Sequence, residues 1–318
     1  SFSELGSNWF PTKKGSYMGI ITVGVVFGGL VGNGLMGSVI TNVGITQGMM
    51  ILVVLNVILL VLCAILVKSH PEEAGAYPDN DKNLTPEQAH AMLAAQEEAK
   101  KNSVWNIKNM FRTPGFWLIT IPQGVLLLGA VGAMTQVMSI LNEYEGFIVG
   151  GVAPTTKGTV TLLIFAAVGC LGSWILGMID TKFGTRVAII ISCALMVLAG
   201  ILCALHILPL FFVGFGCLQV FMGASSNFTV SAAAQYWKRE DFPSAFSFIN
   251  PLANLICAFG PFLIAGLHAA TGGFTLVWIV IAALGLVSLI LTLIFHPSMI
   301  LEADKKYRIE AGLPEEGL

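Results

Sequence analysis

Charged side chains are scarce in this sequence. Only 11% of its residues are Asp, Glu, Lys or Arg, whereas 55% are hydrophobic. A soluble domain carries about 25% charged residues, because charge has to cover its surface, and a disordered chain needs low hydrophobicity. The shortage of charge therefore excludes both an ordinary soluble globule and a disordered chain. It leaves a protein with several membrane-spanning segments.

Motifs for metal binding and redox chemistry are also lacking. None of the six cysteines forms a C-x-x-C pair, all of them lie in apolar runs, and no histidine stands near them at metal-ligand spacing. We interpret the cysteines as small packing residues. Clustered ionisable groups of the kind that a membrane enzyme needs are missing as well. We therefore expect no metal site, no cofactor, no enzymatic activity and no nucleic-acid partner.

Long apolar runs are present instead. A helix needs about 20 apolar residues to cross a bilayer, whereas strands of a membrane β-barrel run for about ten residues with strict alternation. Eight runs have the length of a helix and are apolar on every side. The sequence therefore predicts an all-α membrane protein with eight transmembrane helices. The eight predicted spans are 18–40, 46–67, 116–141, 159–179, 187–205, 208–232, 246–270 and 274–296.

The basic residues test this assignment. Eight spans place both ends of the chain on one side, and 15 of the 16 Lys and Arg residues fall on that side, with only Lys157 opposite. The positive-inside rule makes that side cytoplasmic. We therefore expect a multi-pass protein of the plasma (inner) membrane with both ends of this chain in the cytoplasm.

Four regions follow from these spans. Residues 1–68 hold the first two spans, 69–113 form a cytoplasmic loop, 114–298 form a bundle of six helices, and 299–318 form a cytoplasmic tail. In the loop, Thr85-Pro86-Glu87-Gln88 predicts a capped helix start. The stretch 104–112 is amphipathic, and we expect its apolar face to lie on the membrane surface.

An internal repeat relates the two ends of the chain. When Trp9 is aligned with Trp237 without gaps, Gly32 faces Gly260, and both stretches end on a His-Pro pair after two apolar runs. Two halves with repeated topology are typical of transporters. If the second half has six spans, the first should have six too. The repeat therefore predicts that this chain is a fragment, with about four helices missing before Ser1.

Two loops carry a resemblance to a known family. The stretch Asn8-Trp9-Phe10-Pro11-Thr12-Lys13-Lys14-Gly15 resembles the loop before the fifth helix of major facilitator superfamily transporters, most of all the oxalate/formate antiporter-like group. The stretch from Asp180 to Arg186 resembles that superfamily's loop between helices eight and nine. The resemblance implies that this chain is helices five to twelve of a twelve-helix fold, with 1–68 as a remnant of the N-terminal bundle.

The second loop is the superfamily's D-R-x-G-R-R motif in a variant form. Asp180, Lys182, Gly184 and Arg186 appear in order, while Thr185 replaces one basic residue. The resemblance implies that Asp180 gates the cytoplasmic side by pairing with basic groups or a helix N-terminus. The alternative is that the cations only anchor the topology.

Small residues recur at four-residue spacing in two spans. Such stripes let helix backbones approach closely in lipid. The resemblance makes these spans helices five and eight, which face each other across the two bundles. The stripes either slide during alternating access or pack statically. Their residues are Gly24, Gly28 and Gly32 in the first span and Gly169, Ser173 and Gly177 in the fourth.

Polar residues inside spans are costly and mark function by default. They either line a central cavity or bond helices together. We expect Pro251 to break the helix between two of them and free a carbonyl group. The intramembrane amides are Asn33, Asn56, Gln123, Gln136, Gln219, Asn227, Asn250 and Asn254. The last six are the candidates for a substrate cavity.

The leading hypothesis is a secondary transporter that moves a small solute by alternating access. The resemblance suggests a small organic anion such as a monocarboxylate, oxalate or formate, exchanged by an antiporter that is monomeric when full length. Sugar-phosphate and nitrate/nitrite carriers have similar loops, and a transporter-like membrane sensor is a further alternative. The spans hold no buried Arg or Lys for an anion, so we expect that charge on the missing helices or at Lys157.

Overall fold

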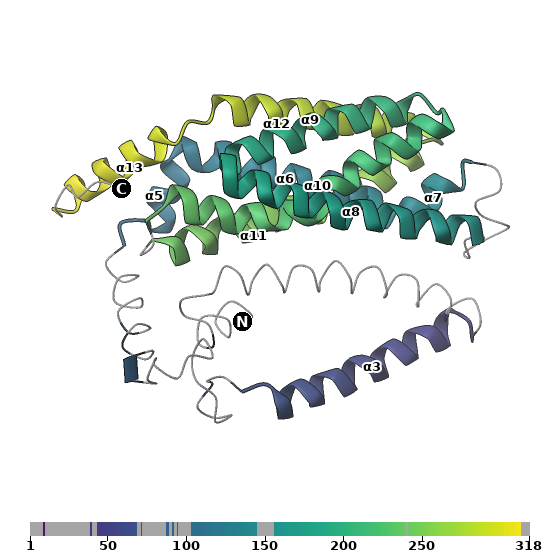
Figure 1. Ribbon diagram of the computed structural model, residues 1–318, viewed down its shortest axis with the longest axis horizontal. Helices are drawn as coiled ribbons and strands as arrows, with labels where there is room; N and C mark the ends of the chain where they lie inside the picture. Colours follow the sequence, from purple (N-terminus) through teal and green to yellow (C-terminus); the bar gives the residue numbers. More distant parts are fainter. Residues whose placement is uncertain are drawn as a thin grey trace. The chain divides into compact units, whose positions relative to one another are not determined.

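The fold is entirely helical over the residues that the structure describes. The computed structural model describes residues 9, 39, 43–68, 71, 87–88, 91, 94, 103–144, 156–238 and 241–312 (Figure 1). The chain divides into two compact units, residues 1–101 with 149–155 and residues 102–148 with 156–318.

Seven of the described helices are long and apolar enough to cross a membrane. They coincide with seven of the eight predicted spans. The remaining prediction, 18–40, lies outside the described residues apart from Val39, and with it lie Gly24, Gly28, Gly32 and Asn33. The seven are α3 (Ile45–Leu66), α6 (Pro114–Thr135), α8 (Thr156–Phe183), α9 (Thr185–Ala204), α10 (Leu208–Tyr236), α11 (Phe242–Thr271) and α12 (Thr275–Ile294).

In the first unit, α3 is the only long helix described. It buries only Gly48, and the Asn56 amide donates to the Leu52 carbonyl at 2.9 Å within the same helix. The indole nitrogen of Trp9 donates to the carbonyl of Lys68 at 2.9 Å. Trp9, which belongs to the stretch that carries the family resemblance, is thereby bonded to Lys68, two residues after the end of α3.

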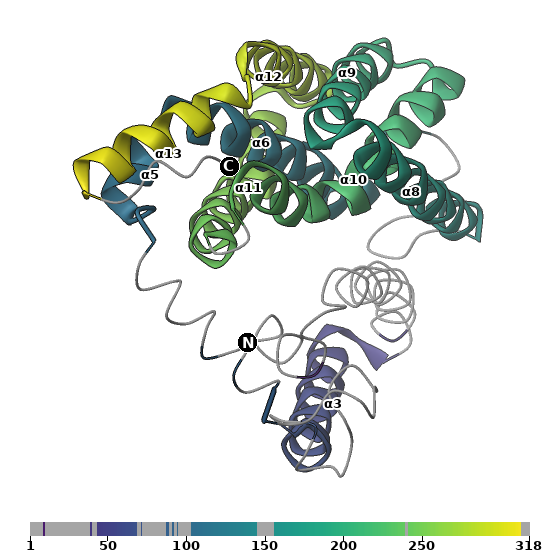
Figure 2. The same cartoon turned by 60° about the vertical axis from the view of Figure 1, so that its left-hand side comes forward.

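The second unit is a bundle of six long helices. The helices α6 and α10 lie in the middle, α9 and α12 cover one side of them, and α8 and α11 cover the other (Figures 1 and 2). Most of α6 is buried, whereas α8 and α11 expose much of their apolar surface. The exposed surfaces are apolar because lipid, unlike water, does not penalise them.

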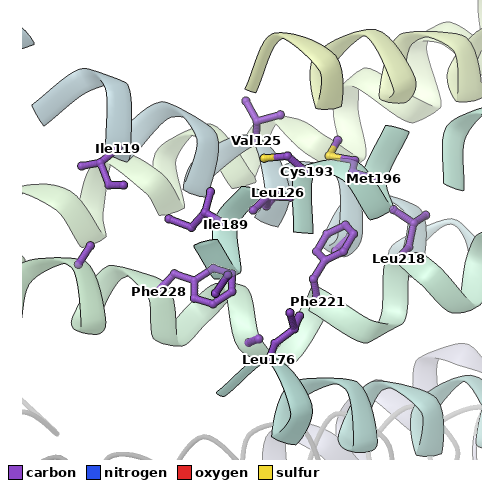
Figure 3. Close-up of a cluster of buried hydrophobic side chains, with 14 of the residues drawn as sticks. Ile119, Val125, Leu126, Leu176, Ile189, Cys193, Met196, Leu218, Phe221 and Phe228 are labelled. Carbon is purple, nitrogen blue, oxygen red and sulfur yellow. The ribbon is translucent and has the colours of Figure 1, made fainter. Parts of the chain in front are cut away.

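The core of this bundle is apolar and aromatic. Side chains of α6, α9 and α10 meet there, with Leu126, Cys193 and Phe221 among those that are almost fully buried (Figure 3). Near the start of α10, the rings of Phe211 and Phe215 lie 5.4 Å apart, and Phe215 meets Trp278 of α12 edge-on at 6.4 Å. Rings packed in this way hold the middle and outer helices in register.

The bundle has one end rich in cations, which we call the basic end. There α6, α9 and α11 begin, and α8, α10 and α12 end. A short helix, α5 (Ile107–Arg112), precedes α6 at this end, and α13 (Ser298–Glu310) follows α12 (Figure 1). At the opposite end, α6 stops at Gln136 and a single turn, α7 (Val137–Leu141), continues the chain. The predicted span 116–141 is therefore two helices.

Two expectations about local structure are wrong. Pro251 does not break α11, which runs through both Pro251 and Pro261, although each proline removes one backbone donor. The apolar residues of 104–112 do not all face a membrane surface either. Val104, Trp105 and Met110 are buried in the second unit, while Ile107 and Phe111 stay exposed. The indole N–H of Trp105 is satisfied inside the protein, which favours burial there.

Helix pairs approach closely at glycines. A Cβ atom added to Gly132 of α6 would lie 2.9 Å from the carbonyl carbon of Gly260 on α11, and one added to Gly260 would lie 2.5 Å from the carbonyl oxygen of Leu128. Contacts this short require the absence of a side chain on both helices. Close packing of this kind is the main attraction between helices in lipid.

We predict that Gly260→Ala destabilises the bundle by about 1–3 kcal/mol, because a methyl group would be forced against the backbone of α6. Gly266→Ala on the same helix is the matched control, since no atom lies within 4 Å of a Cβ at that position. Thermal unfolding in detergent should show a lower midpoint for Gly260→Ala and an unchanged midpoint for Gly266→Ala. Equal midpoints would contradict the contact.

Candidate functional site

The predicted cavity residue Gln123 lies in the middle helix α6 and is fully buried. Neither its side-chain oxygen nor its side-chain nitrogen has a hydrogen-bond partner among the described residues. Thr120, one turn earlier, is equally buried and its hydroxyl is also unpartnered. Buried polar atoms in native proteins are nearly always bonded, so each exception calls for an explanation.

Two neighbouring helices carry further polar groups that do have partners. The Thr229 hydroxyl of α10 donates to the Asn250 side-chain oxygen of α11 at 3.3 Å. The Asn254 amide donates to the Asn250 carbonyl at 2.8 Å and to its side-chain oxygen at 3.0 Å. Asn254 is exposed. These bonds link α10 to α11 and leave part of the Asn254 amide accessible.

Register places these groups at one depth. A Cβ atom on Gly124 of α6 would lie 3.2 Å from the Cα of Ala253, and Gly132 meets Gly260 further along, so α6 and α11 run in the same direction. Thr120 lies one turn before Gly124 on α6, and Asn250 lies one turn before Ala253 on α11. Thr120 and Asn250 are therefore at a similar depth in the bundle. We call Thr120, Gln123, Thr229, Asn250 and Asn254 the polar layer.

Of the other predicted cavity residues, Gln136 and Gln219 lie at other depths, whereas Asn227 lies close to the depth of the layer. Gln136 caps the end of α6 at the opposite end of the bundle. Gln219 is buried on α10, with an unpartnered side-chain nitrogen, about 15 Å from Thr229 along the helix. Asn227 is half-buried on α10, two residues from Thr229. The structure therefore groups Gln123, Asn250 and Asn254 by depth and separates Gln136 and Gln219 from them.

Thr120 and Thr229 belong to the layer but were not predicted. Threonine hydroxyls bond readily to their own helix, so they carry a weak signal in a sequence. The three-residue spacing of Thr120 and Gln123, which puts both on one helix face, is the pattern that could have found the first of them.

The small-residue stripe of α8 contacts α10. A Cβ atom on Gly169 would lie 3.3 Å from the Gln219 carbonyl oxygen, and one on Gly172 only 2.4 Å from the Cα of Val220. Gly172, which the stripe did not include, is the tightest contact. The Ser173 hydroxyl is buried without a partner among the described residues, whereas Gly177 faces open space. Part of the stripe thus packs within the bundle, and sliding against the first span stays a prediction.

The turn between α8 and α9 contains the predicted gating motif. Gly184 has a φ of 90°, a left-handed conformation that glycine adopts without strain. Its N–H donates to the Asp180 carbonyl at 2.9 Å, and the Thr185 hydroxyl donates to the Asp180 carboxylate at 2.6 Å. Thr185, at the position of a basic residue in the family motif, therefore binds the carboxylate as a neutral donor.

Arg186 connects this turn to other helices. Its side chain donates to the carbonyls of Thr292 at 3.3 Å and Leu293 at 2.8 Å, where α12 ends. A cation at a helix C-terminus is favourable because the last carbonyls carry partial negative charge. The backbone N–H of Arg186 also donates to the Tyr236 hydroxyl at 3.0 Å, at the end of α10. The Lys182 ammonium lies 5.4 Å from the Phe183 ring. The turn thus ties three helix ends together.

A second set of contacts joins helix ends at the opposite end of the bundle. His206, with a φ of 54°, lies 2.8 Å from the Thr275 hydroxyl and 3.6 Å from the Glu143 carboxylate. The other Glu143 oxygen accepts the Phe274 N–H at 3.2 Å. Burial, with smaller contributions from Cys203 and Glu143, raises the pKa of Tyr144 to about 12.

These features define a class of protein: a polytopic helical membrane protein with polar groups inside a packed bundle and bonded turns at its basic end. A sequence profile of the Major Facilitator Superfamily matches residues 5–231 and 150–310 of the chain. The chain belongs to the Major Facilitator Superfamily, and it is a membrane transport protein for a solute. No curated protein gives a significant match.

We predict that Asp180→Asn lowers the transport rate about tenfold or more, because a hydrogen bond to a charged group contributes about 1.5–3 kcal/mol. Insertion into the membrane should be unchanged. Thr185→Val, which removes the same hydrogen bond but keeps the charge, should lower the rate by a similar factor. Transport measured against the amount of protein in the membrane tests this, and wild-type rates in both variants would exclude a gating role.

Proposed function

We propose that this protein is a secondary carrier that moves a small organic anion, such as a monocarboxylate, oxalate or formate, by alternating access. The observation that carries the proposal is the pair of buried, unpartnered side chains Thr120 and Gln123 in a bundle of this superfamily. Carriers in which two bundles rock around a site near the bilayer midplane leave polar groups there for the solute.

The chemistry of the polar layer suits carboxylate oxygens. Amide N–H₂ and hydroxyl groups are donors, and Gln123, Thr120 and Asn254 present them at one depth. In the described spans, Asp, Glu, Lys and Arg occur only within four residues of a helix end, at Lys157, Asp180, Lys182 and Arg186. We infer that the positive charge that an anion requires comes from residues outside the described part of the chain.

The same lack of carboxylates bears on coupling. A proton-coupled carrier needs a titratable group at the site, and the interiors of the described spans contain no Asp or Glu. Exchange of one anion for another requires no such group. This argues against a proton relay in the described helices, and the proposal of an antiporter rests on the family resemblance. Sugar-phosphate and nitrate carriers, or a membrane sensor, are the alternatives that the test must distinguish.

We expect vesicles that contain the purified protein and unlabelled oxalate to accumulate labelled oxalate or formate by exchange. Gln123→Leu should reduce this exchange about tenfold or more, since it removes a hydrogen-bonding side chain without changing the volume much. Gln136→Leu, which alters a similar amide outside the polar layer, is the matched control. Exchange of sugar phosphate or nitrate in place of carboxylates would select an alternative carrier, and no exchange of any anion would favour a sensor.

We further propose that the basic end faces the cytoplasm, because 15 of the 16 Lys and Arg residues fall on its predicted side. Lys157, at the start of α8, is exposed and belongs to the other side. A cysteine placed at Lys157 should react with a membrane-impermeant maleimide in intact cells, and one at Lys305, also exposed, only after permeabilisation. Background labelling is removed by replacing the exposed Cys63 and Cys170. The reverse pattern would overturn the orientation.

A further inference from the structure

A buried network of charges joins three distant parts of the chain at the basic end. Asp241, in the turn between α10 and α11, and Asp304, in α13, are each 1% exposed. Arg308 donates to Asp304 at 2.9 Å and lies 3.6 Å from the Asp241 carboxylate. Lys238 lies 3.9 Å from Asp304. Two buried carboxylates are thus matched by two basic side chains.

The third part is the segment that leads into α5. The Ser103 hydroxyl donates to the Asp241 carboxylate at 2.5 Å, and the indole N–H of Trp105 donates to Asp304 at 3.0 Å. The Trp105 ring, 2% exposed, meets the rings of Trp237 and Tyr307 edge-on at 5.7 Å and 5.8 Å. Both aspartates therefore accept hydrogen bonds from this segment.

Helix α13 covers the segment with one face. Its buried residues are Ile300, Asp304 and Tyr307, which follow one another at helical spacing. The Tyr307 hydroxyl lies 3.3 Å from that of Thr113, at the start of α6. The cations Lys305 and Lys306 lie on the exposed face. The chain beyond the last span is thus a structural element of the bundle.

We propose that α13 is a permanent clamp that holds residues 103–112 on the bundle, so that the hinge between the two units ends before Ser103. The proposal rests on alternating access, because only that motion requires a hinge. It moves the start of the second moving body from the predicted residue 114 to about residue 103. Release of the segment would take one hydrogen-bond donor, Ser103 or Trp105, from each of two buried carboxylates, and this loss favours a permanent contact.

The clamp can be tested without any transport. Trypsin cleavage after Lys108 and Arg112, measured by mass spectrometry, reports release of this segment. Trp105→Phe keeps the ring but removes the donor to Asp304, and Asp304→Asn removes the charge. We expect each to raise the cleavage rate about tenfold, as for the loss of a charge-assisted hydrogen bond. Lys305→Gln, on the exposed face of the same helix, should leave cleavage unchanged. Unchanged cleavage in both test variants would overturn the clamp.

A cross-link tests whether the clamp is permanent. Ser103→Cys with Asp241→Cys, with Cys63 and Cys170 replaced, should form a disulfide under oxidation. We expect the same transport rate in the oxidised and reduced protein, because the joined residues move together. Loss of transport on oxidation that dithiothreitol restores would show that the segment detaches in each cycle, and the proposal would fall. If the protein transports none of the solutes tested, the proteolysis result still decides whether the clamp exists.

Discussion

The backbone N–H and C=O groups of the membrane-spanning helices have to find their partners within the protein, because the hydrocarbon core of a bilayer offers none. Most of the structure follows from this constraint. The backbone forms helices, apolar side chains face lipid at little cost, and charged side chains gather at the helix ends. Since lipid does not drive apolar helices together, the helices associate through close contacts such as that of Gly132 with Gly260.

The same constraint gives the basic end its organisation. Two of its charged groups lie close to carbonyl or hydroxyl partners: Asp180 accepts from Thr185, and Arg186 donates to the last carbonyls of α12. Asp241 and Asp304 go further, because both are almost fully buried and depend on Arg308 and Lys238. The turn after α8 and the segment before α5 therefore both make hydrogen bonds to charged groups of the bundle.

Apolar runs and charge position predicted much of this fold. Seven described spans match predicted ones, six of them within four residues at each end, since run length is a direct consequence of bilayer thickness. What the sequence did not reveal depends on contacts between distant residues. The burial of Trp105 requires Asp304, 199 positions away, and no local pattern connects them. Likewise, Gly172 rather than Gly177 makes the tightest contact of α8, because which face of a helix meets its neighbour is set by the whole bundle.

For the amides in the spans, the structure separates two roles that the sequence cannot separate, helix bonding and solute binding. From the sequence, every one of them fits both roles. In the structure, Asn250 already accepts from Thr229 and Asn254, so its side-chain oxygen serves to join α10 and α11. Gln123 makes no hydrogen bond to a described residue despite complete burial. A buried polar side chain without a partner bears a desolvation cost that calls for an explanation, and the solute binding that we propose would supply one for Gln123.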